Sequence, residues 1–154
     1  MLQNQLKFKF LLIFFLSILT CKADEVHDPN YICGKWMSTN KDYMVLVYKD
    51  SNGFKGKTLW FKNTDNTKAM DEWTDKHNPD PSLRSRKLIG LVILNGLTYA
   101  PSSNTWENGK IYDAKSGHEY SASVQITKAG LLKVTGYWGF KFIGRSLTFN
   151  RVIN

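Results

Sequence analysis

The stretch "DYMVLVYKDSNGFKGKTLWFK", residues 42–62, contains two apolar runs separated by a turn motif. The first run, residues 42–49, is apolar on both faces, which is typical of a strand covered on both sides or packed in a tight barrel. Asn52-Gly53 tolerates the positive φ angles that a hairpin turn requires. Residues 54–62 are therefore predicted to form the antiparallel partner of the first strand.

Short alternating runs separated by turn residues continue along the chain. Residues 118–127 alternate clearly, because Tyr120, Ala122 and Val124 share one face while the residues between them are mostly polar. Turns are predicted at Asn95-Gly96, Lys115-Ser116-Gly117 and Ala129-Gly130. Gly144 is expected to mark a bulge or a close backbone approach. The remaining predicted strands are residues 31–38, 88–94, 110–113, 131–138 and 140–152.

These runs amount to about eight strands joined mostly by short turns, which predicts a single antiparallel barrel of the all-β class. The length of 154 residues suits one domain. Hydrophobic residues make up 42% and charged residues 22%, a balance that excludes a disordered chain.

The N-terminus is predicted to be a cleaved signal peptide, residues 1–23. Lys7 and Lys9 precede an apolar run at residues 10–19, and cleavage is expected after Ala23. This run is about half of the roughly 20 apolar residues that a membrane-spanning helix needs. The expected organisation is a signal at 1–23, an N-terminal tether at 24–30 and a barrel domain at 31–154. The protein is expected to be periplasmic or secreted. Lipoprotein anchoring through Cys21 is disfavoured, because Thr20 precedes it.

Charge and cysteine content narrow the functional classes. Removal of residues 1–23, which contain three lysines and no acid, lowers the net charge from +8 to +5. The remaining lysines are scattered without interleaved aromatic residues, so nucleic acid is excluded as a partner. Cys33 would be the only cysteine left, so no internal disulfide can form. Its apolar surroundings favour a buried or half-buried thiol over a nucleophile.

A long segment without alternation, residues 63–87, interrupts the strands and is a candidate functional loop or lid. It ends in "NPDPSLRSRKLIG", residues 78–90. Asp80 is predicted to be the N-cap of one helical turn and Pro81 its first residue. Arg84 and Arg86 are expected to pair internally with Asp75 or Asp80, with an anionic ligand head group as the disfavoured alternative.

Four blocks of the sequence resemble the bacterial domain-of-unknown-function family 2147. They are "GKWMS", "NPDPSLRSRKLIG", "WENGKIYDAKSGHEYSASV" and "KVTGYWGFKFIGRSLTFNRV", and they extend from about residue 34 to residue 152. The resemblance implies a small exported protein of Gram-negative bacteria with a lipocalin-like, or calycin, barrel. It implies no particular activity, because none is established for the family.

The calycin resemblance also implies a structural role for three residues. In such barrels a Gly-x-Trp on the first strand closes one end, and an arginine from the last strand packs on the indole. Gly34-Lys35-Trp36 matches the first part, and Arg151 is preferred to Arg145 for the second. A guanidinium stacked on an indole is a favourable cation–π pair.

The favoured function is binding of a small apolar or lipid-like ligand inside the barrel. The candidate ligand-binding residues are Arg84, Arg86, Trp60, Trp106, Tyr120 and Trp138. The alternative is that these aromatic side chains simply fill the interior. A second class is an interaction module without a pocket, which contacts an envelope protein or an anionic lipid face through exposed lysines.

A hydrolase that uses Asp75, Asp80 and His77 is the third class, and the sequence disfavours it. No nucleophile motif, glycine-rich phosphate loop or metal-binding histidine spacing is present. The sequence therefore assigns no catalytic residue, no metal ligand and no cofactor.

Overall fold

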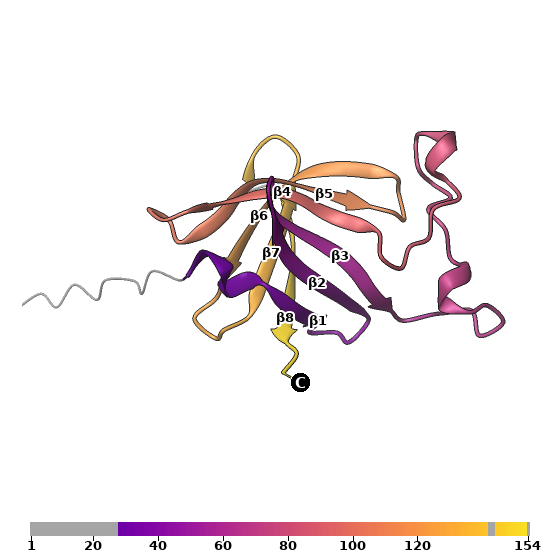
Figure 1. The fold of residues 1–154 in the computed structure, drawn as a ribbon, viewed down its shortest axis with the longest axis horizontal. Helices are drawn as coiled ribbons and strands as arrows, with labels where there is room; N and C mark the ends of the chain where they lie inside the picture. The colour runs from indigo at the N-terminus through magenta and orange to yellow at the C-terminus, as the bar shows by residue number, and fades with distance from the viewer. Residues whose placement is uncertain (1–27, 142–143, 154) are drawn as a thin grey trace, which may run out of the picture.

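The computed structural model describes residues 28–141 and 144–153, and these residues form eight antiparallel strands in one closed barrel. Each strand pairs with the next one in the chain, and β8 pairs back with β1, as Figure 1 shows. The strands are β1 (Gly34–Ser38), β2 (Tyr43–Asp50), β3 (Gly53–Phe61), β4 (Val92–Ala100), β5 (Thr105–Asp113), β6 (His118–Ile126), β7 (Leu132–Tyr137) and β8 (Arg145–Arg151). The predicted all-β barrel class is confirmed. The predicted signal peptide and residues 24–27 of the tether lie outside the described residues.

The prediction for the fourth strand was wrong. The strand was expected at residues 88–94, followed by a turn at Asn95-Gly96, but β4 runs from Val92 to Ala100 and passes straight through this pair. Gly96 has a φ of 71°, and the register shifts between the pairs that β3 makes with Leu94 and Leu97. The positive φ that an Asn-Gly pair tolerates therefore forms a β-bulge at this position and not a hairpin turn. Bulges and tight turns need the same backbone freedom, so the pair is compatible with both.

Three other strand boundaries differ from the prediction. Residues 29–32 form the 3₁₀ helix η1 (Pro29–Ile32), so the first strand begins at Gly34 and not at Tyr31. Strand β5 begins at Thr105 and not at the predicted residue 110, and β8 begins at Arg145 instead of residue 140. Gly144 does mark a close approach, since a Cβ on it would lie 2.7 Å from the carbonyl oxygen of Gly136.

The core fills the barrel from the end that η1 occupies. Trp36, Leu97 and Trp106 are fully buried there, and Trp106 makes an edge contact with Phe54 at a centroid distance of 6.5 Å. The other buried apolar residues are Ile32, Val45, Val47, Leu91, Leu94, Ala122, Val124, Leu132, Val134 and Phe149. Burial of this apolar surface is the main favourable contribution to folding, at roughly 25 cal/mol per Å².

Trp36 and Arg151 close this end of the barrel. Arg151 lies over the Trp36 indole at 4.3 Å, and its Nη1 donates a hydrogen bond of 3.0 Å to the Cys33 carbonyl. The indole Nε1 of Trp36 in turn donates to the Ile32 carbonyl at 2.8 Å. Arg145 lies exposed at the start of β8. Arg151 both donates to the Cys33 carbonyl and covers the Trp36 indole, and these two contacts connect the last strand to the first.

The beginning of the described chain takes part in the same closure. Asp28 caps η1 by accepting a hydrogen bond from the Asn30 amide at 2.9 Å. Trp106 on β5 donates its Nε1–H to the Pro29 carbonyl at 2.9 Å. Residues 28–30, which the sequence placed in a tether, are therefore fixed to the barrel wall.

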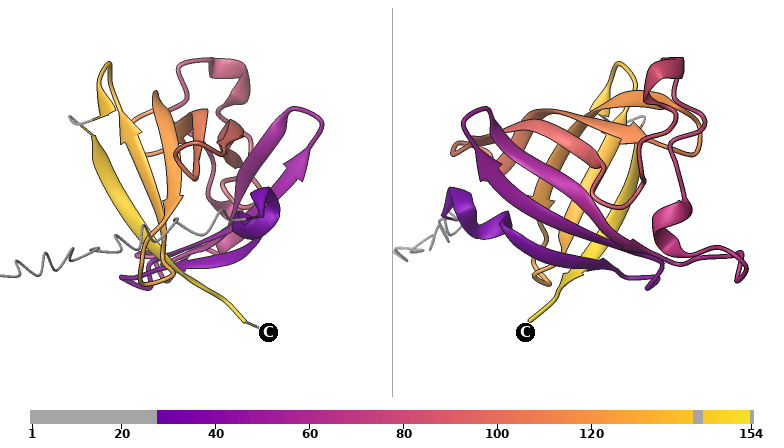
Figure 2. Two further views of the ribbon diagram at one scale, coloured as in Figure 1. Left: turned by 90° about the vertical axis from the view of Figure 1, so that its left-hand side faces the viewer. Right: turned by 45° about the vertical axis from the view of Figure 1, so that its right-hand side comes forward.

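The long connection between β3 and β4, residues 62–91, lies at the other end of the barrel and is called the excursion here. The β1–β2, β5–β6 and β7–β8 turns lie at that same end, because the strands alternate in direction. The excursion contains the 3₁₀ helices η2 (Met70–Glu72) and η3 (Pro81–Leu83), as Figure 2 shows. The barrel is thus packed shut at the η1 end and carries its irregular elements at the excursion end.

Candidate ligand-binding site at the excursion end

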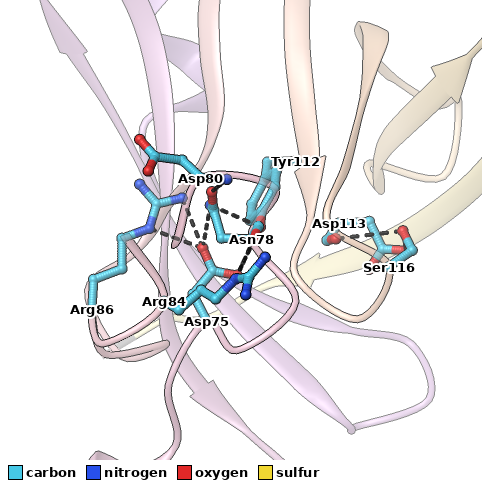
Figure 3. A network of polar contacts seen from close by, with 8 residues as sticks. All are labelled: Asp75, Asn78, Asp80, Arg84, Arg86, Tyr112, Asp113 and Ser116. Carbon is cyan, nitrogen blue, oxygen red and sulfur yellow. Dashed lines mark hydrogen bonds and ion pairs between the residues drawn. The ribbon is translucent and has the colours of Figure 1, made fainter. Parts of the chain in front are cut away.

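Asp75 anchors the excursion to the barrel wall. Its carboxylate is fully buried and accepts hydrogen bonds from Tyr112 Oη at 2.7 Å, Asn78 Nδ2 at 2.8 Å and Arg86 Nε at 2.9 Å. Arg86 Nη2 lies 2.9 Å from the same oxygen, so the two residues form an ion pair. Figure 3 shows these side chains converging from two parts of the excursion and from β5.

The charge of Asp75 is compensated despite its burial. Burial alone would raise the pKa of this carboxyl, but the hydrogen bonds from Tyr112, Asn78 and Arg86, together with the Arg86 charge, hold the pKa below its ordinary value. Burial and the neighbouring carboxylate raise the pKa of Tyr112. Asp75 is therefore ionised and Tyr112 protonated at neutral pH, which preserves the hydrogen bond between them.

The segment "NPDPSLRSR" closes on itself beside Asp75. Asp80 accepts a hydrogen bond from the Ser82 amide at 2.9 Å and so caps η3, of which Pro81 is the first residue. Arg84 Nε donates to the Asn78 carbonyl at 2.8 Å. Arg86 thus forms the ion pair with Asp75 that the sequence favoured, whereas Arg84 is held by a backbone carbonyl oxygen.

The excursion also packs closely on the β5–β6 turn. Gly117 in that turn has a φ of 74°, and a Cβ on it would lie 2.0 Å from the His77 carbonyl oxygen. Asp113 organises the turn by accepting hydrogen bonds from the Lys115 amide at 2.9 Å and from Ser116 Oγ at 2.8 Å. Only glycine fits this contact, so the position of the excursion depends on the absence of a side chain at residue 117.

A cleft of about 510 Å³ lies between the docked excursion and the barrel. This volume is within the range of about 300–1,000 Å³ that is typical of small-molecule sites. Its walls come from the excursion, from β4, β5 and β6, and from the residue that follows β7. The lining residues are Asn78, Pro79, Arg86, Val92, Ile93, Asn95, Lys110, Tyr112, Gly117, His118, Glu119 and Trp138.

The strand register places much of this cleft on the outer face of the barrel. Leu94 pairs with Ile111, and Leu94 is buried in the core. Asn95 and Lys110, the next pair along, line the cleft and therefore occupy the opposite face. Successive residues of a strand point to opposite sides, so the cleft does not coincide with the packed interior.

The cleft combines apolar and cationic side chains. Ile93, Tyr112 and the strongly exposed Trp138 provide apolar surface. Arg86 and Lys110 provide positive charge, with Glu119 as a carboxylate in the same lining. Such a surface suits a small molecule that has an apolar part and an anionic group.

The predicted ligand-binding residues are distributed over different parts of the molecule. Trp106 is fully buried at the η1 end, and Tyr120 makes an edge contact with Trp138 at 6.1 Å. Trp60 pairs with Met44 after a bulge in β3, which places it on the outer face. Of the six residues, only Arg86 and Trp138 line the cleft.

The residues of the proposed hydrolase do not converge on an open site. The Asp75 carboxylate is enclosed by its three hydrogen-bond donors, and Asp80 caps η3. His77 is exposed and presents its carbonyl to the β5–β6 turn. Within residues 28–141 and 144–153, no group of three or more His, Cys, Asp or Glu side chains could hold a metal ion.

Sequence reasoning did not assign Ile93, Asn95, Lys110 or Tyr112 to a ligand-binding site, although Lys110 was counted among the exposed lysines of the interaction module. Tyr112 and Lys110 alternate on β5 and could have been assigned to one face. The side of the barrel on which this face lies, and the approach of Asn78 and Arg86, depend on the docking of the excursion. No local signal in the sequence reports that docking.

The model of a protein family described as "Uncharacterized protein conserved in bacteria (DUF2147)" matches residues 34–151. The chain belongs to this family. A solved structure described as "Protein HP1028 from the human pathogen Helicobacter pylori belongs to the lipocalin family" is similar in fold, with a TM-score of 0.65. It is 24% identical in sequence, and the match covers 79% of this chain and 83% of that chain. The lipocalin-like barrel is therefore shown, and the likeness concerns the fold alone.

No curated protein matches the chain significantly. Among the described residues, no helix is long and apolar enough to cross a membrane.

Proposed function

We propose that this protein is exported and binds a small amphipathic molecule with an anionic group in the cleft beside the excursion. The observation that carries the proposal is the cleft of about 510 Å³, whose walls combine apolar side chains with Arg86 and Lys110. The lipocalin-like fold supports a binding role, because barrels of this kind offer ligand sites at one end of a rigid scaffold.

Arg86 and Lys110 are the residues proposed to hold the anionic group. Arg86 uses Nε and Nη2 for Asp75, which leaves Nη1 for a second partner, and its side chain is 38% exposed. Because Asp75 fixes the guanidinium, little side-chain entropy is lost when a ligand binds. Lys110 adds a second positive charge from β5.

The apolar part of the ligand is proposed to lie against Ile93, Tyr112 and Trp138. The ring of Tyr112 is held in place by its hydroxyl bond to Asp75 and by Arg86, whose guanidinium lies 5.5 Å from the ring centroid. Trp138 is 73% exposed and has room to pack on a ligand. The same network that docks the excursion therefore also fixes two walls of the site.

Calorimetric titration of the full chain with dodecanoate tests the cleft, with uncharged dodecyl maltoside as the head-group control. Lys110→Glu is expected to weaken dodecanoate binding at least tenfold, because about 1.4 kcal/mol is lost when an attractive charge becomes repulsive. Lys115→Glu is the matched control, since Lys115 is exposed on the β5–β6 turn outside the cleft. Equal affinity of the two variants for dodecanoate would exclude the cleft as the binding site. Absence of binding by the wild-type chain would favour the interaction module without a pocket.

The export proposal rests on Lys7, Lys9 and the apolar run at residues 10–19, followed by small residues up to Ala23. Mass spectrometry of the protein recovered from cell fractions tests it. We expect a chain that begins at Asp24, in the periplasm or the medium. A chain that retains residues 1–23 would overturn the proposal, and acylation at Cys21 would replace it with lipoprotein anchoring.

A further inference from the structure

A second hollow adjoins the cleft, and the binding role proposed above does not use it. This hollow, called the groove here, has a volume of about 350 Å³ and lies along the end of the excursion and the first residue of β4. Its lining residues are Arg86, Lys87, Ile89, Gly90, Leu91 and Val92. Arg86 and Val92 also line the cleft, and Val92 is 40% exposed between the two hollows. The cleft and the groove therefore meet at these two residues.

Backbone hydrogen bonds hold the segment that forms the groove. The Gly90 N–H donates to the Thr58 carbonyl at 2.8 Å, and the Thr58 N–H donates to the Leu91 carbonyl at 3.0 Å. On the side of the excursion, the Asp75 N–H donates to the Arg86 carbonyl at 3.0 Å. The groove is thus formed before any ligand arrives, so little conformational entropy is lost when a ligand occupies it.

The groove has the same combination of surfaces as the cleft. Ile89 and Val92 provide apolar surface. Among the described residues that line the groove, Arg86 and Lys87 are basic and none is acidic. Lys87 is paired with Asp71 at the surface, whereas Arg86 uses Nε and Nη2 for the buried carboxylate of the excursion, as Figure 3 shows. The Arg86 guanidinium is therefore a fixed cation at the junction of two partly apolar hollows.

We propose that the cleft and the groove together bind one anionic lipid with two acyl chains, a ligand class that rests on the binding role proposed for the cleft. A fatty carboxylate carries a single chain and would leave the groove empty. In a lipid of the phosphatidic acid type, one phosphate is joined to two chains through glycerol. The phosphate contacts Arg86 and Lys110, because a guanidinium suits phosphate oxygens. One chain lies in the cleft, and the second lies against Ile89 and Val92.

Calorimetric titration of the full chain with dioctanoyl phosphatidic acid tests this proposal. The comparison probe is octanoyl lysophosphatidic acid, and both are used below the concentrations at which they form micelles. The two probes present the same phosphate group, so the difference in their affinities reports the second chain. We expect the two-chain probe to bind about tenfold more tightly, because its second chain is removed from water in the groove.

Gly90→Asn is the variant that obstructs the groove. Gly90 has a φ of 82°, and a Cβ on it would meet no described atom within 4 Å, so a side chain fits without overlap. Asparagine is among the residues that best tolerate a positive φ. The variant should bind the two-chain probe about tenfold more weakly and the single-chain probe as the wild type does.

Gly130→Asn is the matched control, because Gly130 has a φ of 76° and equally open surroundings but lies between β6 and β7, outside both hollows. It should bind both probes as the wild type does. A second variant, Ile89→Thr, keeps the branched side chain and makes the groove wall more polar. It should weaken binding of the two-chain probe alone, by about threefold. Circular dichroism verifies that each variant is folded.

The outcomes separate this proposal from the binding role of the cleft. If dodecanoate binds in the cleft but the two-chain probe has no advantage over the single-chain probe, the two-chain lipid is excluded and the cleft keeps its single-chain ligand. Retention of that advantage in Gly90→Asn, or its loss in Gly130→Asn as well, overturns the assignment of the second chain to the groove. If the wild-type chain binds neither dodecanoate nor either phosphatidic acid probe, both proposals fail.

Discussion

Replacement of Asp75 by asparagine is expected to release the excursion from the barrel. Asparagine can still accept the Tyr112 hydrogen bond, but its amide nitrogen would face the N–H groups of Asn78 and Arg86. A hydrogen bond to a charged group contributes about 1.5–3 kcal/mol, and a buried donor without an acceptor carries a further cost. Because Arg86 is 38% exposed, its pairing with Asp75 is screened by solvent and contributes less than a fully buried pair. The expected loss is about 2–4 kcal/mol.

Urea denaturation at neutral pH measures this loss through the free energy of unfolding. Limited proteolysis with trypsin locates it, since release of the excursion should speed cleavage at Arg84 and Arg86. Asp71→Asn is the control, because the Asp71–Lys87 pair has side chains that are 64% and 61% exposed. Such exposed pairs contribute little, so the control should unfold as the wild type does. A loss for Asp75→Asn no larger than that of the control would refute the reasoning.

The pH dependence provides a second check on the same carboxylate. The folded state lowers the pKa of Asp75 below the ordinary value of 3.8, so the unfolded state binds its proton first as the pH falls. The contribution of Asp75 to the free energy of unfolding is therefore fully present above pH 3.8. It is lost as the pH falls through the lower pKa that Asp75 has in the folded state. The difference in unfolding free energy between the wild type and Asp75→Asn should narrow over that interval. A difference that stays constant down to the lowest pH measured would contradict this assignment.

Two further predictions concern the docking of the excursion and the closure of the barrel. Gly130→Ala should cost about 1–2 kcal/mol from its positive φ alone, whereas Gly117→Ala should cost about 1–3 kcal/mol more, because its Cβ would overlap the His77 carbonyl. Equal unfolding free energies for these two variants would show that the contact is not tight. Arg151→Met should lower the unfolding free energy by about 2 kcal/mol through loss of the cation–π contact and the Cys33 hydrogen bond. Arg145→Met is its control and should leave the thermal midpoint unchanged, and a similar shift in both variants would argue against a closing role for Arg151.

Local features of the excursion were predictable because they depend on neighbours in the sequence. An aspartate followed by a proline predicts an N-cap, and Asp80 does cap η3. Arg86 and Asp75 are 11 residues apart, and their pairing was favoured for that reason. Tyr112 was not foreseen as the third partner, because it comes 37 residues after Asp75 and from a different element.

Small departures from regular strand geometry account for the errors in the predicted position of β4 and the predicted inward orientation of Trp60. A bulge in β3 shifts Trp60 to the outer face, although alternation from the buried Thr58 would have placed it inside. The Asn95-Gly96 pair also forms a bulge and not a turn, so β4 was predicted too early. One extra residue reverses every later side chain of a strand, and a single sequence does not reveal it.

The sequence by itself determined the all-β class, the approximate number of strands and the cap at Asp80. These depend on alternation, turn residues and local hydrogen bonds, which act over a few residues. Only the tertiary structure decided that the interior is packed at the η1 end and that the cleft lies outside it, beside the excursion. The physical reason is that the cleft exists through contacts between segments distant in the chain, of which the Asp75–Tyr112 bond and the Gly117–His77 contact are the principal ones.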